Sequence, residues 1–546
     1  MILNIDTRLW KTFLPVLLAL ALVLAACGGA ASPEAPTEAP AAEEPAAEEP
    51  APEEPAAEEP MDEEPMDEMM GPAGTLRVAF QPIVQTDPAL ISSDSEVFVA
   101  NHVYDYFVDV DENSNSVPRL ATAWTQSTDG LTWTFTLAEN VTFHDGSAFG
   151  AADVVWTYDR LRDPDLGFPT STLYENIVSV EATGDLEVTF TLASPNPFFL
   201  YDLSDNHALV IKNGTDDASD FNGTGPFVVS NYSPEDRVEM VANENYFIEG
   251  RPHLAGLDVL FFNEDTAMVD ALRGGQVDLV MRMSTSLFES LQSEAGIVTY
   301  DIPTNGFNGI RLRIDREPGN DPRILEAMKL SIDREAILAV VAQGYGAIAH
   351  DSPIGPLYGP FHDASVRAPA RDVQAAIDLL TAAGYPDGID LVLHVPDSGD
   401  RPDLATVLQQ QWGEAGINVE LSVEPESVYY GENGWLEVDL GITGWGSRPY
   451  PQFYLDIMLA SGGIWNEAHF ADAEFDALST LAGTTLDDEE RIEAYSQIQQ
   501  LLAERGPIII PYYFAQFGAI NEAFNDGFAM KAFAGRTDVS HIVFTP

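Results

Sequence analysis

The sequence predicts an α/β protein, because strand patterns and helical patterns follow one another along most of its 546 residues. Residues 75–80 have strand composition, and 132–137 and 186–192 alternate apolar and polar side chains with a period of two. Helical patterns cover 151–161, 322–330, 333–343, 372–383 and 487–504. Short strands mixed with helices in this way favour an α/β architecture over a β-sandwich or a helical bundle.

Turn and capping residues mark the limits of several of these elements. Asp129-Gly130 predicts a turn before the strand at 132–137. Asp153 and Asp333 place a negative charge where a helix begins, which the helix dipole favours. Gly384 follows the helical pattern at 372–383 and predicts its end. The run GTGPF at 223–227 predicts a tight turn into a new strand.

The N-terminus has the pattern of an export signal. Arg8 and Lys11 precede an apolar run over 13–26, which is too short for a membrane-spanning helix. The run ends in Leu-Ala-Ala-Cys-Gly, and Cys27 is the only cysteine of the chain. This end resembles a bacterial lipobox, which implies a signal peptide over 1–26 and lipidation of Cys27. The alternative is an ordinary signal peptide that contains a cysteine.

Residues 27–73 predict an extended, disordered linker between the lipidated cysteine and the folded body. Glu-Glu-Pro-Ala-Ala is repeated with small variations, so that prolines block helices and carboxylates repel one another. We therefore expect an extracytoplasmic protein, periplasmic or on the outer surface, that a lipid anchor holds on the cell membrane.

Composition excludes several functions. The formal net charge of −63 argues against binding to nucleic acid or docking on anionic lipids. Hydrophobic residues make up 45% of the chain, which excludes a wholly disordered protein. The sequence has no Gly-x-Ser-x-Gly elbow, no His-Glu-x-x-His pair and no P-loop. We therefore expect no enzyme and no cofactor.

A series of motifs in the folded body resembles one protein family. They are PRLATAW at 118–124, DGLTWTF at 129–135, VTFHDG at 141–146, GTGPF at 223–227, NENYF at 243–247, LRGGQVD at 272–278, AAGYPDG at 382–388 and GWG at 444–446. Their order and spacing resemble the extracellular solute-binding proteins of the peptide/nickel transport family, known as family 5. Most of these motifs contain turn residues and helix starts, and so indicate the fold and leave the pocket unspecified.

The resemblance implies a type 2 periplasmic-binding-protein fold, in which two lobes joined by a hinge close over the ligand, with an extra small domain. By order along the chain, lobe I takes 74–117, 221–316 and 516–546, the extra domain takes 118–220, and lobe II takes 317–515. The implied function is that of a monomeric binding protein, which captures peptides or a related small solute and delivers it to the membrane permease of an ABC importer.

Arg448 stands where the resemblance leads us to expect an acid. In peptide-binding members, an aspartate three residues after the tryptophan of the Gly-Trp motif can pair with the free amine of a peptide. An arginine suits a carboxylate, a phosphate or hydroxyl groups instead. We therefore expect an anionic or modified peptide, or an oligosaccharide. The alternative is that Arg448 forms an internal salt bridge with one of the many carboxylates.

Trp445 is the first candidate for a pocket wall, because an indole offers a flat apolar face with one hydrogen-bond donor. Further candidates for ligand contact are Tyr104, Asn305, Phe307, Tyr429 and Tyr430, with Asn308 next to them in sequence. Core packing is the alternative for each.

Two other functions remain open at this point. Metal or nickel-chelate capture would use histidines such as His350 and His362, each followed by an aspartate, although they lack clustered spacing. A surface adhesin or chaperone would use the same fold to bind proteins and would take no small ligand. We predict no metal site.

Overall fold

The computed structural model describes residues 71–111, 115–216, 218–431 and 434–546. The predicted signal peptide, the lipidation site Cys27 and the linker up to residue 70 lie outside these ranges. Within them, no helix combines the length and the apolar character that crossing a membrane requires.

Helices and strands alternate, as the sequence predicts. The strands are β1 (Thr75–Phe80), β2 (Val108–Val110), β3 (Ser116–Pro118), β4 (Ala121–Gln126), β5 (Thr132–Leu137), β6 (Ile177–Gly184), β7 (Glu187–Leu192), β8 (Phe227–Ser233), β9 (Arg237–Ala242), β10 (Gly256–Phe261), β11 (Leu279–Met281), β12 (Ile297–Leu312), β13 (Ala347–Ile348), β14 (Ile389–Pro396), β15 (Ile417–Glu424), β16 (Leu440–Trp445), β17 (Ile508–Ile509) and β18 (Tyr512–Asn521). The helices are α1 (Asp94–Val103), α2 (Ala151–Leu161), α3 (Phe199–Asp202), α4 (Asp265–Arg273), α5 (Thr285–Leu291), α6 (Pro322–Ser331), α7 (Arg334–Val341), α8 (Val373–Ala382), α9 (Arg401–Gly413), α10 (Glu426–Tyr429), α11 (Gln452–Tyr454), α12 (Ala473–Thr484) and α13 (Asp488–Arg505).

The predicted helix starts are confirmed by their caps. The Asp333 side chain accepts a hydrogen bond from the Ala336 N–H, and Asp153 accepts one from the Gly150 N–H. Helix α7 ends at Val341, earlier than the predicted 343. Gln343 and Gly344 both have positive φ angles there, of 53° and 89°, so the chain leaves the helix in left-handed conformations.

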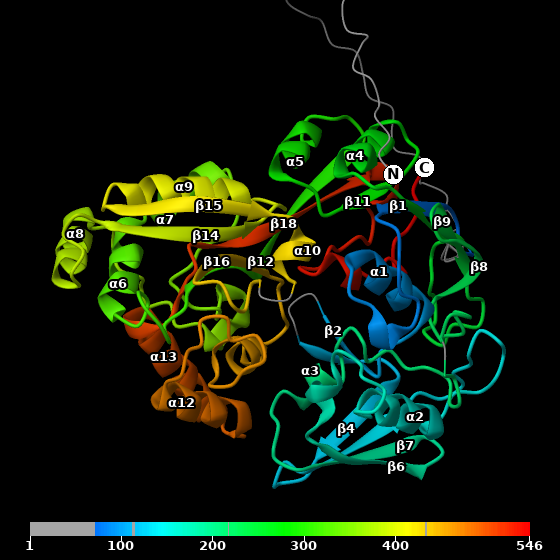
Figure 1. Cartoon of the computed structure of the whole chain (residues 1–546). Helices are drawn as coiled ribbons and strands as arrows, with labels where there is room; N and C mark the ends of the chain where they lie inside the picture. Colours follow the sequence, from blue (N-terminus) through cyan, green and yellow to red (C-terminus); the bar gives the residue numbers. More distant parts are fainter. Residues whose placement is uncertain (1–70, 112–114, 217, 432–433) are drawn as a thin grey trace, which may run out of the picture. The chain divides into compact units, whose positions relative to one another are not determined.

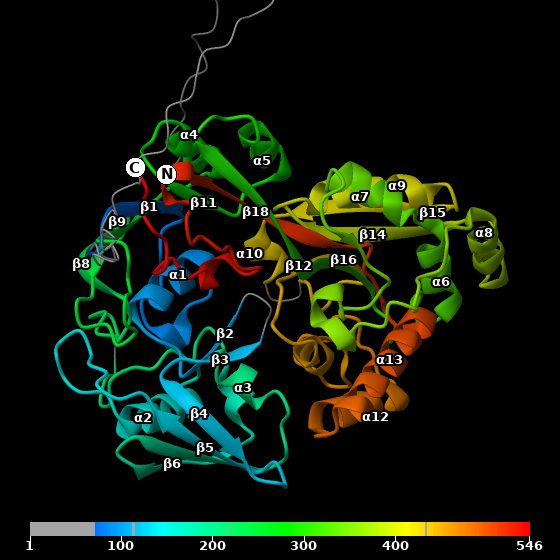
Figure 2. The same cartoon turned by 180° about the vertical axis from the view of Figure 1, so that it is seen from behind.

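One large mixed sheet organises most of the structure. Its strand order is β15-β14-β16-β12-β18-β11-β1-β10-β9-β8. We call β11, β1, β10, β9 and β8 the β1 half, and β15, β14 and β16 with their packed helices the β16 half. In the β1 half, β10 and β11 run parallel to β1, and in the β16 half, β15 and β16 run parallel to β14. Helix α9 packs on β14 and β15, with α7 beside it (Figures 1 and 2).

Strands β12 and β18 connect the two halves. They pair antiparallel from Ile297↔Asn521 to Pro303↔Ala515, and again at Phe307↔Tyr513. Residues 304–306 therefore lie opposite Phe514 alone, which makes a bulge. The Thr304 hydroxyl fills the missing ladder bonds, because it donates to the Phe514 carbonyl over 2.6 Å and accepts from the Gly306 N–H over 3.0 Å.

A separate antiparallel sheet, β4-β5-β7-β6, lies within the range predicted for the extra domain. Its core is aromatic, with Phe135, Tyr158 and Phe190 fully buried between the sheet and α2. Phe199 of α3 belongs to the same core. We call β4–β7, α2 and α3 with the loop that follows α3, residues 121–207, the four-stranded unit; Figure 2 shows its sheet with α2 and α3 close by.

Candidate functional site

The carboxyl ends of β14 and β16 bring two loops to the same edge of the sheet. The strands are parallel, and Leu393 lies beside Leu440, so residues 397–401 and 446–450 follow them at neighbouring positions. Ligands of open α/β sheets bind outside the carboxyl ends of the strands. This edge is therefore the candidate site.

Trp445 is the last residue of β16 and begins a row of aromatic side chains. Its ring centroid lies 6.0 Å from that of Trp465, which lies 6.3 Å from Trp435, which in turn lies 5.5 Å from Tyr430. Trp445 is 7% exposed, and Tyr430 at the far end is 39% exposed. The row becomes more accessible away from the sheet, and it can contact an apolar part of a solute along its exposed end.

A buried ion pair supports this aromatic row from beneath. Arg311 Nε and Glu467 Oε2 lie 3.1 Å apart, and each side chain is no more than 3% exposed. Thr443 donates to the same carboxylate over 2.6 Å, and the Arg311 guanidinium donates to the carbonyls of Val438 and Trp435. Burial raises the pKa of Glu467, although Arg311 opposes the shift.

Arg448 is half-buried in the loop after β16, and its guanidinium lies 4.3 Å above the centre of the Phe453 ring. Across the described ranges, every other arginine guanidinium forms an ion pair or donates a hydrogen bond. Among these residues Arg448 does neither. The internal salt bridge that was the alternative for Arg448 is therefore absent from the described part of the chain.

Arg401 is a second cation at the same edge, and the sequence analysis did not identify it. Its Nη2 atom lies 2.8 Å from Glu426, and a Cβ added to Gly444 would come within 2.4 Å of its Nη1 atom. Glycine at the GWG motif thus allows Arg401 to lie against the backbone of β16. The signal that could have identified it is its position, next to the helix N-cap Asp400 and five residues after the end of β14 at Pro396.

Arg282 brings the β1 half close to this edge. It follows β11, pairs with Asp94 over 2.7 Å and has a positive φ of 66°. Asp94 raises the pKa of Arg282 most, and Glu426 of α10 adds to the rise. A residue after β11 and a residue after β15 are therefore near enough to interact electrostatically.

The structure places four of the other predicted residues inside the protein. Tyr104, Phe307, Tyr429 and Asn305 are each no more than 1% exposed. The Tyr104 hydroxyl donates to the Ala218 carbonyl, the Tyr429 hydroxyl lies 3.0 Å from Thr443 Oγ1, and Asn305 Oδ1 accepts from the Leu357 N–H. Each of these four side chains therefore packs or bonds within the protein.

Asn308 is also buried and donates to Asp400 over 2.8 Å, which ties β12 to the start of α9. His350 accepts a hydrogen bond from the Ala368 N–H, and His362 Nδ1 lies 2.8 Å from the Ile354 carbonyl. In the described ranges no three His, Cys, Asp or Glu side chains are placed to hold a metal ion.

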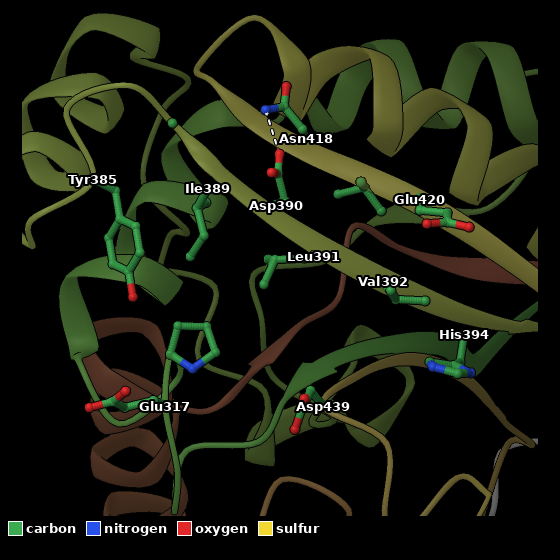
Figure 3. A pocket seen from close by; sticks show the side chains of 13 residues that line it. Glu317, Tyr385, Ile389, Asp390, Leu391, Val392, His394, Asn418, Glu420 and Asp439 are labelled. Atoms are coloured by element: carbon green, nitrogen blue, oxygen red, sulfur yellow. Dashed lines mark hydrogen bonds between the residues drawn. The ribbon is translucent and has the colours of Figure 1, made fainter.

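A surface hollow of about 1060 Å³ lies elsewhere, along the middle of β14 and β15 (Figure 3). Its lining carries acidic side chains, with Asp390, Glu420, Asp439 and Glu317 around Leu391 and Val392. Trp445 and Arg448 do not line it. None of the residues that line this acidic hollow belongs to the candidate site.

Comparison with known proteins shows which family the chain resembles. The sequence model of the bacterial extracellular solute-binding proteins, family 5 (middle region), matches residues 115–466. Heme-binding protein A of Haemophilus influenzae is 27% identical over 460 residues, which cover 77% of this chain and 84% of that protein. Di/tripeptide-binding protein 1 of Pseudomonas aeruginosa is 26% identical, over 77% of this chain and 85% of its own.

Solved structures show the same fold. The oligopeptide-binding protein AppA of Bacillus subtilis, in complex with a nonapeptide, superposes with a TM-score of 0.74 at 23% identity, over 87% of this chain and all of AppA. NikZ of Campylobacter jejuni, in complex with Ni(L-His), gives 0.76 at 24% identity, over 86% of this chain and all of NikZ. The type 2 periplasmic-binding-protein fold expected from the motifs is confirmed.

Proposed function

Because the chain belongs to the bacterial extracellular solute-binding proteins of family 5, we propose that it captures a peptide or a related small solute and delivers it to the membrane permease of an ABC importer. Proteins of this family bind solutes outside the cytoplasm and are not enzymes. In this proposal the chain acts as a monomer, and a lipid on Cys27 holds it at the membrane.

The observation that supports the proposal most directly is the edge formed by the loops after β14 and β16. It combines the aromatic row from Trp445 to Tyr430 with two arginines, Arg448 and Arg401. An apolar wall with a few convergent polar groups is the usual composition of a small-molecule site. In the proposed mechanism, the solute contacts this edge and the β1 half together, and so stabilises the closed arrangement by its differential affinity for it.

A second candidate is a solute with an anionic group, such as an acidic or modified peptide, or an oligosaccharide. The unpaired guanidinium of Arg448 favours it, since an arginine that is half-buried without a partner can bind a carboxylate or several hydroxyls. The two relatives named above are a heme-binding and a di/tripeptide-binding protein, so residues at this edge are expected to decide the choice of solute.

Native mass spectrometry of the full chain, before and after unfolding and refolding, tests the proposal. A small molecule that leaves on unfolding and rebinds afterwards identifies the solute class. Trp445→Ala is expected to weaken its binding at least tenfold, whereas Tyr385→Ala in the acidic hollow is expected to leave it unchanged. If no solute from a peptide and sugar library binds or raises the melting temperature, the adhesin or chaperone function gains support instead.

The anchor is tested separately. Incorporation of labelled palmitate into the wild-type chain, and its loss in Cys27→Ser, is the expected result. Equal labelling of both proteins would contradict lipidation at Cys27.

A further inference from the structure

Two neighbouring phenylalanines of the four-stranded unit pack in two different hydrophobic cores. Phe199 lies in the core of the unit itself, with its ring centroid 5.5 Å from that of Phe190. Phe198 belongs to a core around the loop after β16, and its ring is stacked on that of Tyr450 with centroids 5.0 Å apart. Only 4% of Phe198 is exposed, so a side chain of the four-stranded unit is enclosed by the β16 half.

Further contacts surround this stacked pair, on the side of the four-stranded unit where α3 faces α12 and α13 (Figures 1 and 2). Tyr201 of α3 also stacks on Tyr450, at 5.4 Å, and the Arg491 guanidinium of α13 lies 5.5 Å from the centre of the Phe198 ring. The Tyr450 hydroxyl donates to Asp202 Oδ1 over 2.7 Å, and Asp202 is 5% exposed. The contact therefore combines apolar packing with a directional hydrogen bond, and both require the two parts to meet in one arrangement.

Buried charged groups fix the four-stranded unit to the β1 half. Arg160 of α2 pairs with Asp87, which lies between β1 and α1, and neither side chain is more than 12% exposed. Arg536, near the C-terminus, donates to the Ser204 carbonyl over 2.6 Å, and its neighbour Ala534 lies in the hydrophobic core of the β1 half. We therefore expect the four-stranded unit to move together with the β1 half.

The loop after β16 links the four-stranded unit to the bulge of β12. The Asn305 N–H donates to the Ser447 hydroxyl over 3.2 Å, and Asn305 belongs to the bulge at residues 304–306 between the two strands that connect the halves. The loop of residues 446–450 thus contacts the connecting strands near its start, carries Arg448 in its middle, and contacts the four-stranded unit at its end.

We propose that the four-stranded unit is a latch, in which Phe198 and Asp202 close on Tyr450 when the two halves come together and so position the loop of residues 446–450. The contact must open when the halves separate, because the unit moves with the β1 half and Tyr450 moves with the β16 half. Its buried rings and its hydrogen bond stabilise the closed arrangement even when the protein is empty. The inference goes beyond the proposed function, because it concerns the protein without a solute.

The distance between two spin labels tests the latch. The full chain carries Cys27→Ser together with labels on Glu181→Cys of β6 and Asp378→Cys of α8, which are exposed positions in the two parts that the latch joins. This parent protein is unfolded, dialysed and refolded to remove any solute. Pulsed electron paramagnetic resonance then gives the distribution of distances between the labels.

Three variants of the parent are compared. Phe198→Ala removes the stacked ring, and Tyr450→Phe removes only the hydroxyl that donates to Asp202. Leu166→Ala, at a position of the same unit that is 51% exposed, is the matched control for the loss of an apolar side chain. A circular dichroism spectrum equal to that of the parent shows that a variant is folded.

The parent is expected to populate a shorter distance, which corresponds to the closed arrangement. Phe198→Ala should lower the ratio of closed to open protein about tenfold or more, because the enclosed ring is lost. Tyr450→Phe should lower this ratio by a smaller factor, and Leu166→Ala should leave it unchanged. Identical distributions for the parent and Phe198→Ala, at whichever distance, overturn the inference. If Phe198→Ala does not fold, Tyr450→Phe decides in the same way, because it keeps the ring and its packing.

The outcome is separate from that of the proposed function, because no solute is present. A latch in a protein that binds no solute would leave the inference standing while the proposed function fails. A protein that binds a solute and shows no effect of Phe198→Ala on its distances would keep the proposed function and lose the latch.

Discussion

His102 and Val539, near opposite ends of the described chain, are joined by a hydrogen bond in which the Val539 N–H donates to His102 Nε2 over 3.1 Å. The other ring nitrogen, Nδ1, lies 2.7 Å from the Phe98 carbonyl. One nitrogen must therefore accept while the other donates, which only the neutral imidazole can do. The ring is fully buried, and burial disfavours its protonated, charged form.

The first prediction concerns acid stability. Burial lowers the pKa of His102 from 6.5 to about 4, so the unfolded chain binds a proton between these values that the folded chain does not. The free energy of unfolding should therefore fall as the pH falls from 6.5, by about 3 kcal/mol at pH 4 from this residue.

Urea unfolding between pH 7.5 and 4 checks the first prediction, with His102→Gln for comparison, because His541 also has a lowered pKa and adds to the same trend. A His102 resonance that titrates near 6.5 in the folded protein would contradict it.

The second prediction concerns Asp202 and has the opposite sign. Burial raises its pKa from 3.8 to about 7, against the hydrogen bonds from Tyr450 and Asn196. The folded chain therefore holds a proton that the unfolded chain releases, and this contribution to stability is lost as the pH rises from about 4 to 7. Relative to the wild type, Asp202→Asn should become more stable across that interval, by about 4 kcal/mol in total.

Chemical unfolding of Asp202→Asn at pH 4, 5.5 and 7.5 measures this difference. Asp220→Asn, at an exposed position, is the control and should follow the wild type at each pH. A constant difference between Asp202→Asn and the wild type would show that Asp202 is ionised throughout.

The third prediction concerns the buried pair beneath the aromatic row. Glu467→Gln leaves the Arg311 charge without its counterion at 2% exposure, and should lower the free energy of unfolding by about 3 kcal/mol. Asp439→Asn removes the partner of the half-exposed Arg316 and should cost less than about 1 kcal/mol. Guanidinium unfolding followed by tryptophan fluorescence compares the two variants. Equal losses would mean that the Arg311–Glu467 pair contributes no more than a surface pair.

The fourth prediction concerns the GTGPF motif. A Cβ on Gly223 would lie 1.9 Å from the Val103 carbonyl oxygen, and one on Gly225 would lie 2.6 Å from the Val103 carbonyl carbon. Gly223→Ala should therefore destabilise the protein by about 3 kcal/mol, because backbone must move. Gly413→Ala, on open helix surface, should instead stabilise it by up to about 1 kcal/mol. Thermal unfolding checks both, and an unchanged melting temperature for Gly223→Ala would be the contrary result.

The sequence predicts local structure well where one residue decides it. Asp333 and Asp487 cap helices because a carboxylate satisfies free N–H groups at a helix start, and this chemistry is visible in the sequence. The motif at 223–227 was interpreted as a turn, but its glycines are also needed for close approach to Val103. That contact joins residues about 120 positions apart, so no local pattern could reveal it.

The candidate site could be predicted only in part, because it also depends on contacts between residues that are far apart in the sequence. Arg448 was identified from its place after Trp445, yet the absence of a partner depends on where every carboxylate lies in space. Phe198 and Phe199 look equivalent in the sequence and differ only in the core that each joins. Tyr429 and Tyr430 likewise have opposite exposures, 0% and 39%, although they are adjacent.

The bulge at residues 304–306 interrupts β12 and β18, the two strands that join the halves of the large sheet in the described part of the chain. Two strands joined by a ladder of main-chain bonds cannot slide past each other without breaking the ladder, but they can bend or twist together as a ribbon. The two halves can therefore bend or twist relative to each other about β12 and β18, but they cannot slide. Amide hydrogen exchange should be slow along β12 and β18 and faster at Asn305, whose N–H donates to the Ser447 hydroxyl over 3.2 Å in place of a strand partner.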